Sequence, residues 1–447
     1  MPEIVEQQTG NLAVAAAGKQ DPFVSGKIDS EWLKKLCLDS GADDVGLVEI
    51  GREALADQRD DILSAFPRTK TLIAIVCRLH RESVRAQARN IANTEFHVVG
   101  HRLNSATRKI MRALEDLGVW SVSDSWGFPM NVDAAWPGKM WIVSQKPVAV
   151  EAGLGKMGLH RSVLHPKYGV HIYLAVIMLE KEATAYDRPV DFDPCLKCNL
   201  CAAVCPSGAI AKDGNFDFSS CFTHDYREKL GGFADWVENI VKSKDEFDYR
   251  KRVSERETVS MWQNLSFGGN DKCAYCFAVC PAGENVRGGY EENKDAFVKE
   301  VVKPLQAKKE KIFVIPGSDA EEFVARRFAH KDIARVSNGI RPRSIEGFLS
   351  GASWLFQRGR SEGLDATYHF TFTGAEQAEA TIMIKNKTID IKKGHQGDAD
   401  LHITADSQTW LGFLAKEKNL AWAMITRKIK TRGSISLFPA FGKCFPS

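Results

Sequence analysis

Two short cysteine-rich segments constrain this chain more than any other feature of its sequence. Residues 195–206 read Cys-Leu-Lys-Cys-Asn-Leu-Cys-Ala-Ala-Val-Cys-Pro, and residues 273–281 read Cys-Ala-Tyr-Cys-Phe-Ala-Val-Cys-Pro. The first has the C-x2-C-x2-C-x3-C-P spacing that binds cubane iron–sulfur clusters. Two such clusters need about eight thiolates. The two segments supply seven, and Cys221 is the only cysteine between them. The sequence therefore predicts two 4Fe-4S clusters.

The spacing also predicts which cysteines share a cluster. Cysteines separated by two residues can bind different irons of one cube, whereas the three-residue step and the proline direct the fourth cysteine to the other cube, as in two-cluster ferredoxins. We expect one cluster to be bound by Cys195, Cys198, Cys201 and Cys280. We expect the other to be bound by Cys205, Cys221, Cys273 and Cys276.

Zinc is the alternative to iron–sulfur clusters, because paired C-x2-C segments also have zinc-binding spacing. Two Cys-Pro endings and eight usable thiols exceed what one zinc ion needs, which favours clusters. Clustered cysteines with this spacing indicate a reducing compartment rather than a disulfide framework. The remaining cysteines lie in apolar surroundings that are typical of buried packing residues: Cys37, Cys77 and Cys444.

The overall composition bounds the class of protein. A chain of 447 residues can bury a full core and should hold about two or three domains. Lys and Arg number 60 against 57 for Asp and Glu, so no overall basic field favours a nucleic-acid partner. No apolar run approaches the roughly 18 residues that span a bilayer. Residues 1–26 show neither a basic n-region nor a twin arginine, and we interpret them as a disordered leader of a cytoplasmic protein.

Alternating helix and strand patterns follow this leader and predict an α/β domain. A helix is expected from Asp29 or Ser30, each a plausible N-cap, to Gly41. A longer amphipathic helix is expected over residues 97–117, ended by Gly118. Strands are expected at residues 45–50, 72–76, 140–143 and 170–178.

A glycine-rich turn lies between the last two predicted strands. It contains the pattern G-x-G-x-x-G, formed by Gly153, Leu154, Gly155, Lys156, Met157 and Gly158. Glycines allow backbone amides to approach a bulky ligand closely. The same pattern occurs in dinucleotide-binding folds. Here no convincing strand precedes it, and no acidic residue about twenty positions later is placed for a ribose, which argues against NAD.

Three further segments accompany this turn: Lys146-Pro-Val-Ala-Val-Glu before it, His165-Pro-Lys-Tyr-Gly169 after it, and Arg188-Pro-Val-Asp-Phe before the first cysteine segment. In this order the segments resemble the cobalamin-dependent reductive dehalogenases. The related epoxyqueuosine reductases share much of the pattern, and the resemblance extends over about residues 27–300. Cys221, in Ser-Cys-Phe-Thr-His, matches the extra cluster ligand of that family.

The resemblance implies a fold and cofactors. A nitroreductase-like α/β domain, residues 27–185, would hold base-off cobalamin, and a bacterial-ferredoxin module with two 4Fe-4S clusters, residues 186–300, would deliver electrons to the cobalt. The glycine turn, residues 153–158, and His160 after it are the expected cobalamin contacts; a surface position is the alternative for His160. We expect the electron donor to be a reduced ferredoxin or a flavodoxin-type protein.

A reductase of this kind needs a proton donor above the cofactor. Asp133 stands where epoxyqueuosine reductases carry their catalytic aspartate. Burial against a corrin would raise the pKa of its carboxyl, so that it could act as a general acid; a turn or cap role beside Trp136 is the alternative. Dehalogenases instead use a tyrosine, and the matching region here offers His97 and His101. His97 is the second candidate acid, because imidazole titrates near neutrality. The alternative is that both histidines are solvated or line the core.

The carboxyl-terminal third follows a different pattern. Residues 301–339 are predicted to be a linker, and a helix is expected to begin after Ser344. Strands are then expected to begin at residues 368, 380, 388 and 400, with helices at residues 410–414 and 421–425. This α+β order resembles the sterol-carrier-protein type of lipid-binding domain over residues 340–447, which implies a lipid-like ligand between a sheet and helices. The alternative is a packing or dimerisation domain whose cavity is filled by its own side chains.

The sequence therefore predicts a cobalamin-dependent iron–sulfur reductase that cleaves a carbon–halogen or carbon–heteroatom bond of a small hydrophobic or aromatic substrate. One alternative is an epoxyqueuosine-reductase-like enzyme that modifies tRNA. Near-neutral charge and the lack of the helical repeats that such enzymes carry at this end argue against a nucleic-acid substrate. The other alternative is a non-catalytic electron-transfer or cobalamin-handling protein with a lipid-binding appendage.

Overall fold

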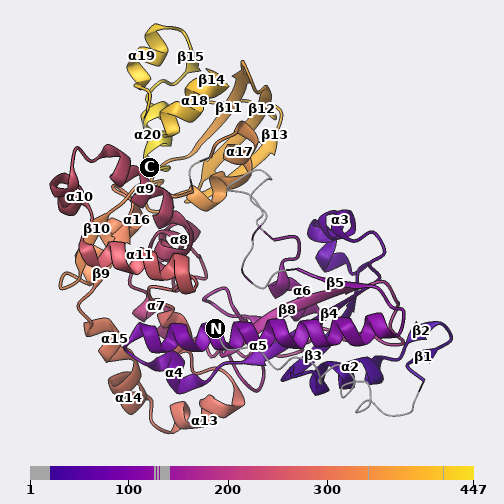
Figure 1. The fold of residues 1–447 in the computed structure, drawn as a ribbon. Coiled ribbons are helices and arrows are strands. Elements are labelled where there is room, and N and C mark those ends of the chain that lie inside the picture. The colour runs from indigo at the N-terminus through magenta and orange to yellow at the C-terminus, as the bar shows by residue number, and fades with distance from the viewer. Residues whose placement is uncertain are drawn as a thin grey trace. The chain divides into compact units, whose positions relative to one another are not determined.

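The structure is a computed structural model that describes residues 21–124, 127, 130, 141–340, 342–415 and 417–446. The chain forms two compact units (Figure 1). Unit 1 contains the described residues up to 130 together with residues 141–203 and 275–304. Unit 2 contains residues 204–274 and the described residues from 305 onward. The chain therefore passes from one unit to the other within each cysteine segment, after residue 203 in the first and after residue 274 in the second.

A four-stranded sheet forms the centre of unit 1. Its strands, in spatial order, are β3 (Asp44–Glu49), β4 (Thr71–Arg78), β8 (Ile172–Leu179) and β5 (Ser121–Ser123). All neighbouring strands are antiparallel, and Ile73 of β4 lies between Leu47 of β3 and Ile177 of β8. The predicted alternation of helices and strands is present. The antiparallel strand direction was not part of that pattern, because periodicity detects elements and not their direction.

Helix α5 (Arg89–Asp116) packs along this sheet against β4 and β8 (Figure 1). It begins well before the predicted start at residue 97, because Ala92 and Phe96 already belong to its buried stripe. Its end agrees with the prediction, since Gly118 follows with a φ of 71°. A glycine in this left-handed conformation commonly ends a helix.

The amino-terminal elements of unit 1 agree with the sequence only in part. Helix α2 (Ser30–Asp39) is capped by Asp29, whose carboxylate accepts the N–H of Trp32 at 2.8 Å, as predicted. Strands β1 (Phe23–Val24) and β2 (Lys27–Ile28) pair as a hairpin. The predicted leader is therefore wrong for its last residues, and residues 1–20 lie outside the described residues.

The remaining elements of unit 1 are short. They are η1 (Glu53–Leu55), α3 (Ala56–Ala65), α4 (Arg81–Arg85), α6 (Gln145–Glu151), β6 (Lys156–Met157), β7 (Val163–Leu164), α12 (Tyr275–Val279), α13 (Glu284–Glu292), α14 (Lys294–Phe297) and η3 (Val298–Val302). The strand predicted at residues 140–143 is wrong for residues 141–143, which have no regular structure. Side chains replace a strand partner there, since Asp124 accepts the N–H of Val143.

The first part of unit 2 is mainly helical. Its elements are α8 (Phe218–Asp225), η2 (Arg227–Gly231), α9 (Gly232–Lys242), α10 (Glu246–Arg252) and α11 (Glu255–Phe267). Two further helices include a unit boundary, α7 (Leu200–Val204) and α15 (Lys303–Ala307).

Residues 301–339, predicted to be a linker, instead contain a folded β-α-β unit. Strand β9 (Lys311–Val314) pairs in parallel with β10 (Asp332–Arg335), and α16 (Asp319–Arg327) connects them. Ile312, Val314 and other apolar residues form a small core of this unit. The charged run before residue 311 concealed these short strands in the sequence.

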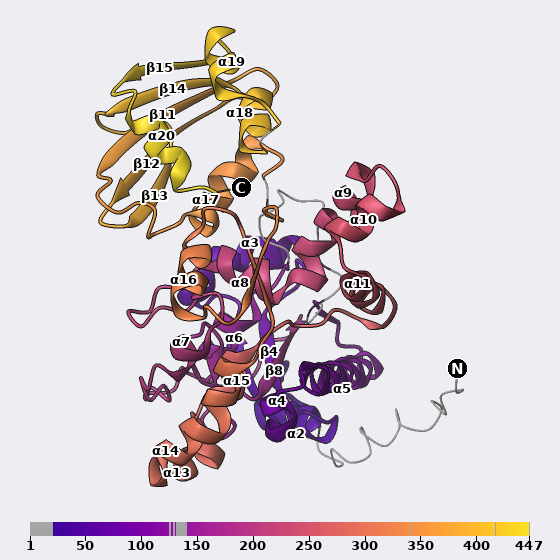
Figure 2. The same ribbon diagram turned by 90° about the vertical axis from the view of Figure 1, so that its left-hand side faces the viewer.

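A five-stranded sheet forms the carboxyl-terminal part of unit 2 (Figure 2). In spatial order its strands are β13 (Thr388–Lys393), β12 (Ala378–Lys385), β11 (Ala366–Thr373), β14 (Leu401–Asp406) and β15 (Ile429–Gly433). Only the central pair β11–β14 is parallel. The accompanying helices are α17 (Ile345–Leu355), α18 (Ser407–Leu414), α19 (Leu420–Ile425) and α20 (Leu437–Lys443). The predicted strands and helices of this region are confirmed, including Ser344 as the N-cap of α17, whereas β15 and α20 were not predicted.

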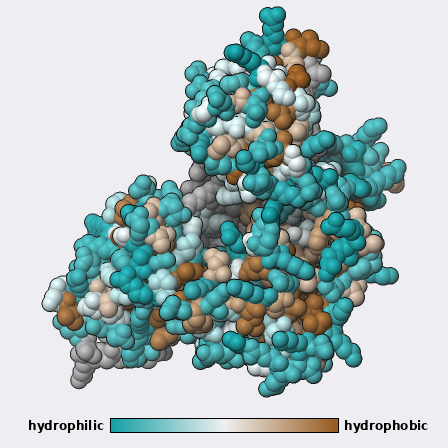
Figure 3. All heavy atoms as spheres, turned by 180° about the vertical axis from the view of Figure 1, so that it is seen from behind, coloured by the Kyte–Doolittle hydropathy of each residue, from teal (hydrophilic) through white to brown (hydrophobic). Residues whose placement is uncertain are grey.

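The surface drawn in Figure 3 is mostly hydrophilic, and its hydrophobic residues form several separate patches. Among the described residues, none of the helices has the length and apolar character needed to cross a membrane.

Candidate iron–sulfur centre

Four predicted cluster ligands lie together in unit 1. Cys195 and Cys280 belong to one apolar cluster of side chains. The pKa of the Cys201 thiol is raised to about 12, mainly by burial and then by the charge of Cys198. Burial also raises the pKa of Cys280, and the charges of the other three thiols raise it further. The structure therefore brings together the four cysteines that we predicted to share a cluster.

The turns between the cysteines contain backbone conformations that non-glycine residues rarely adopt. The φ angle is 51° at Lys197 and 59° at Asn199 in the first segment, and 46° at Ala274 in the second. Such left-handed conformations cost about 1–3 kcal/mol each and concentrate at functional sites. Across the described ranges, no three His, Cys, Asp or Glu side chains surround the position of a single metal ion. This result is compatible with a cubane, because each of its four thiolates binds a different iron.

Cys280 is positioned by the loop that contains His165-Pro-Lys-Tyr-Gly169. The N–H of Glu284 donates to the carbonyl of Pro166 at 3.0 Å, so the chain after Cys280 runs against this loop. Gly169 has a φ of 61°, and a Cβ added there would overlap the carbonyl oxygen of Ala282. The glycine is therefore required by the close approach of two backbone segments.

Replacing Gly169 with alanine is expected to destabilise unit 1 and to lower the iron bound through Cys280. The left-handed backbone and the overlap with Ala282 together should cost more than about 2 kcal/mol. Iron per chain after reconstitution and the Tm of the variant measure the effect. Gly51→Ala is the matched control, because an added Cβ there meets no atom within 4 Å. Equal iron content and Tm in the two variants would contradict this role of Gly169.

The cysteines predicted for the second cluster are divided between the units. Cys205, Cys221 and Cys273 belong to unit 2, whereas Cys276 belongs to unit 1. Burial raises the pKa of Cys205, whose sulfur lies 3.8 Å from the hydroxyl of Ser207. The second set of ligands therefore stays a prediction.

Asp225 fixes the start of the second cysteine segment. It follows Cys221 by one turn of α8, and its Oδ1 accepts the N–H groups of Cys273 at 2.8 Å and Ala274 at 3.0 Å. Burial raises the pKa of this carboxyl. The sequence analysis missed Asp225, although its spacing of four residues from Cys221 places both on one face of a helix.

A second buried carboxylate supports the same region of unit 2. Glu228 accepts a hydrogen bond from Asn264 at 2.6 Å and forms an ion pair with Lys272, which precedes Cys273. Lys229, the next residue, pairs with Asp271 at 2.5 Å. These contacts fix Asp271 and Lys272, the two residues before Cys273.

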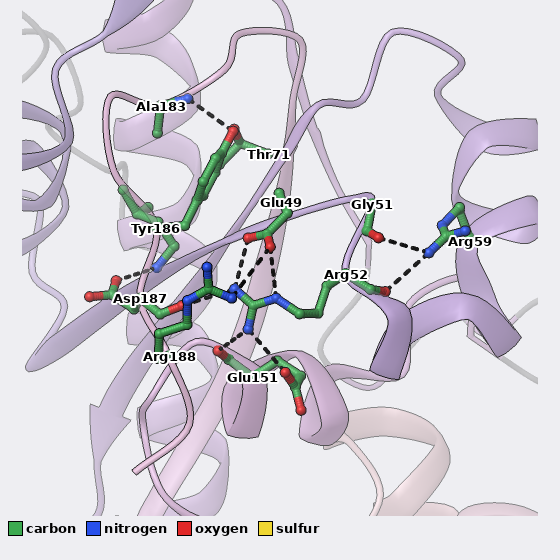
Figure 4. A network of polar contacts seen from close by, with 11 residues as sticks. Glu49, Gly51, Arg52, Arg59, Thr71, Glu151, Ala183, Tyr186, Asp187 and Arg188 are labelled. Atoms are coloured by element: carbon green, nitrogen blue, oxygen red, sulfur yellow. Dashed lines mark hydrogen bonds and ion pairs between the residues drawn. The ribbon is translucent and has the colours of Figure 1, made fainter.

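A buried arginine holds the chain around the glycine turn in unit 1. Figure 4 shows Arg52 between Glu49 and Glu151, with ion-pair distances of 2.8 and 3.0 Å. Its guanidinium also donates to the carbonyls of Glu151 and Asp187. Arg52 therefore links β3 to the end of α6, directly before the turn, and to the segment that leads to the first cysteines.

The glycines of the turn serve the packing of the chain itself. Added Cβ atoms would press on the carbonyl of Arg188 at Gly153, on the carbonyl of Leu164 at Gly155 and on the Leu164 side chain at Gly158. The turn follows helix α6 and contains strand β6, whereas a dinucleotide-binding motif runs from a strand through the turn into a helix. The close neighbours of these glycines are therefore protein atoms, and NAD binding lacks its structural context.

The other three residues of the turn lie in different environments. Leu154 is a core residue with 3% of its surface exposed, and it packs with the sheet. Lys156 is half-buried and Met157 is exposed, and both belong to the short strand β6. Leu154 is thus unsuited to contact a cofactor, because the core already covers its side chain.

His160 retains an unused hydrogen-bond donor. Its Nδ1 accepts the N–H of Ser162 at 3.2 Å, which leaves the proton of the neutral ring on Nε2. Nε2 is buried and has no hydrogen-bond partner among the described residues. Burial, and to a smaller extent the charge of Lys146, lowers the pKa of this histidine to about 4. The ring lies 6.2 Å from that of Phe277, within the second cysteine segment, and burial of His160 excludes the alternative of a surface position.

The candidate proton donors differ in what the structure describes. Asp133 lies outside the described residues. His97 is half-buried on α5, and His101, one turn later, is exposed. The neighbour of His97, Phe96, has its ring 6.3 Å from that of Phe277, so this part of α5 runs beside the second cysteine segment.

A cavity of about 620 Å³ adjoins the start of the glycine turn. Its lining is largely charged and includes Lys34, Asp187 and Arg188 beside Gly153. Lys34 and Asp187 already pair at 2.7 Å. Such a lining does not suit a small hydrophobic molecule, because burying its charges against an apolar surface costs free energy.

The sheet of the carboxyl-terminal part covers an aromatic core. Trp410 is fully buried, with its ring 5.6 Å from that of Phe348 and 5.2 Å from that of Phe370. Its Nε1 has no hydrogen-bond partner among the described residues. An indole N–H usually finds a partner when it is buried.

Two family models match parts of the chain. Residues 188–211 match a 4Fe-4S binding domain, which includes the whole first cysteine segment. Residues 355–445 match the SCP-2 sterol transfer family. Both predicted resemblances, to an iron–sulfur domain and to a sterol-carrier-type domain, are thereby confirmed.

The curated relatives are epoxyqueuosine reductases. The enzyme of Bacillus anthracis is 26% identical over 148 residues, which is 31% of this chain and 34% of that protein. The enzyme of Cyclobacterium marinum is 34% identical over 82 residues, or 18% of this chain and 26% of that protein. The chain thus spans about a third of the length of the first of these relatives. All are reductases by name, which agrees with the predicted oxidoreductase and confirms the resemblance to this family.

Solved structures give weak overall matches. Epoxyqueuosine reductase from Streptococcus thermophilus matches with a TM-score of 0.34 and 15% identity, covering 61% of this chain and 74% of that chain. A catabolic reductive dehalogenase in complex with 3-bromo-4-hydroxybenzoic acid matches with a TM-score of 0.38 and 17% identity, covering 66% of this chain and 39% of that chain.

Proposed function

We propose that this chain is an iron–sulfur oxidoreductase that uses cobalamin to cleave a carbon–halogen or carbon–heteroatom bond of a small hydrophobic or aromatic substrate. The observation that carries the proposal is the convergence of Cys195, Cys198, Cys201 and Cys280, which belong to distant parts of the sequence. The similarity to named reductases supports the same class of reaction.

The reaction consumes two electrons and one proton. The substrate bond is replaced by a carbon–hydrogen bond, and the leaving group departs with the bonding electron pair. Electrons come one at a time from a reduced ferredoxin or flavodoxin-type protein and pass through two 4Fe-4S clusters. The second cluster would use Cys205, Cys221, Cys273 and Cys276.

One observation in unit 1 supports a polar cofactor beside His160. The buried N–H of His160 lacks a partner and is free to donate to a bound group. Cobalamin would supply a strongly reducing metal centre for the bond cleavage. His160 would orient the cofactor, and Asp133 or His97 would hold the proton that the product requires.

An epoxyqueuosine-reductase activity on tRNA is the second candidate. The names of the curated relatives favour it. The SCP-2 match over residues 355–445 favours the small apolar substrate instead, because domains of this type bind apolar molecules between sheet and helices.

Anaerobic reconstitution with iron, sulfide and hydroxocobalamin tests the cofactors. We expect about eight irons and one cobalt per chain after desalting, and a cob(II)alamin resonance without nitrogen superhyperfine splitting, which identifies the base-off form. Eight irons without cobalt would remove cobalamin from the proposal and leave an electron-transfer protein. Iron-free protein that retains zinc would remove the proposal altogether.

The same reconstituted protein separates the two substrate classes. With a chemical reductant, halide release from halogenated aromatic compounds supports the first candidate. Conversion of epoxyqueuosine in a tRNA anticodon stem-loop, without halide release, supports the second and contradicts the first.

A further inference from the structure

Unit 1 contains a group of buried donors whose N–H groups are not used by the protein. Within the described part of unit 1, four buried guanidinium nitrogens have no hydrogen-bond partner, namely Nε and Nη2 of Arg85 and of Arg89. Both ring nitrogens of His171 are in the same state. Arg89 is 8% exposed and His171 is 3% exposed. A buried polar group without a partner costs about 1–3 kcal/mol, and more when it is charged.

The local contacts of the two arginines use only one arm of each guanidinium. Arg85, at the end of α4, directs Nη1 to Glu82 at 3.1 Å. Arg89, at the start of α5, directs Nη1 to the carbonyls of Val84 and Ala86, which close α4. The side chains are therefore held firmly while their remaining donors stay available. This is the arrangement of a preorganised binding site rather than of a structural ion pair.

These donors lie beside the second cysteine segment. The guanidinium of Arg89 lies 5.4 Å from the ring centroid of Tyr275, the first residue of α12. Arg85 and the thiol of Cys280 are close enough for their charges to interact. His171 in turn lies within reach of the charge of Arg85. Helix α4, which ends at Arg85, also packs against α12, which ends at the residue before Cys280. The unused donors thus lie beside the second cysteine segment.

An anion is the partner that such a site requires. A cubane with four thiolate ligands carries net negative charge, and its sulfurs accept hydrogen bonds. Burial of Arg85 makes its charge expensive, and a nearby anion offsets that cost. Reduction adds one more electron to the cluster, so a fixed positive charge stabilises the reduced form more than the oxidised form.

We propose that Arg85, together with Arg89 and His171, forms the electrostatic lining of the cluster bound by Cys195, Cys198, Cys201 and Cys280 and raises its reduction potential. The inference rests on the ligand set of the proposed function. It assigns positioning and tuning residues that no part of the cysteine pattern indicates. Neither cobalamin nor substrate enters it.

The test is a redox titration of the reconstituted full-length protein, followed by electron paramagnetic resonance. Arg85→Gln keeps a hydrogen-bond donor and removes the charge. It should shift the one-electron reduction equilibrium of one cluster about tenfold toward the oxidised form, which is about 59 mV to more negative potential. Arg85→Lys should remain near the wild-type value, and the other cluster should not shift in either variant.

Arg287→Gln is the matched control. Arg287 is an exposed arginine of α13 in the same unit, paired with Glu291 at 2.7 Å. It should leave both potentials unchanged. If Arg85→Gln loses iron, Arg89→Gln is measured in its place. It should shift the reduction potential of the same cluster in the same direction. If both variants bind the full amount of iron and their reduction potentials do not shift, the proposed role of the arginines is contradicted, whereas the proposed reductase function is not. Wild-type protein that binds no cluster would overturn the proposed function itself.

Discussion

Replacing Cys198 with alanine should remove about half of the iron from the reconstituted protein, from about eight to about four atoms per chain. Cys198 belongs to the four thiols that the structure brings together in unit 1, and a cubane rarely survives the loss of a thiolate that no neighbour can replace. Iron analysis and electron paramagnetic resonance measure the loss. One cluster signal should disappear and the other should keep its shape.

Two further variants test how the clusters share the cysteine segments. Cys280→Ala should remove the same signal as Cys198→Ala, although the two residues lie in different segments. Cys205→Ala should remove the other signal. Cys37→Ala is the control, because this thiol is fully buried in unit 1 and lies outside both segments. Loss of different signals in Cys198→Ala and Cys280→Ala would contradict the ligand assignment.

Replacing Arg52 with methionine should lower the free energy of unfolding by about 3 kcal/mol. The side chain of Arg52 is only 9% exposed, and its removal would leave Glu49 and Glu151 without their cation. Methionine keeps most of the apolar stem, so the loss reports the charge and its hydrogen bonds. Urea denaturation followed by fluorescence measures it. Lys35→Met is the control, because the exposed pair of Lys35 with Asp39 should contribute less than about 1 kcal/mol.

Wild-type protein and Arg52→Met should also differ in the pH dependence of their stability. The hydrogen bond from Arg52 lowers the pKa of Glu49 below its ordinary value of 4.5. A lowered pKa in the folded state stabilises the protein above the unfolded-state value, and that contribution is lost as the pH falls through the folded-state value. Wild-type stability should therefore fall more steeply below about pH 4.5 than that of Arg52→Met. Parallel pH profiles would exclude Glu49 as the titrating group.

The sequence predicted the parts of this protein whose physical cause is local. Asp29 was one of two candidates for the first cap, and a helix was expected after Ser344, because a helix start depends on one side chain and the next three backbone amides. The structure places Cys280 near the three thiols of the first segment, as the spacing suggested, and their binding of one cluster stays a prediction. The strands of the carboxyl-terminal sheet alternate buried and exposed residues, and this alternation is visible in the sequence.

Features that depend on distant contacts were missed. Arg85 and Asp225 resemble ordinary charged residues in the sequence, and only the fold shows that one lies near Cys280 and that the other binds the backbone of Cys273. The sequence also does not reveal that the carbonyls of Arg188 and Leu164 approach the glycine turn, whose contact with a cofactor stays a prediction. The short strands β9 and β10 pair only with each other and lie within charged surroundings, so periodicity could not identify them.

The left-handed residues at Lys197, Asn199 and Ala274 would make assembly of the proposed clusters part of folding. Without thiolate–iron bonds, nothing would offset the free-energy cost of these turns, so their native conformation would be less stable before the clusters bind. Insertion of iron and sulfide would then act as a late folding step that fixes the conformation of both cysteine segments. Loss of a cluster to oxygen would reverse that step, and the first sites to become accessible to a protease would be the cysteine turns themselves.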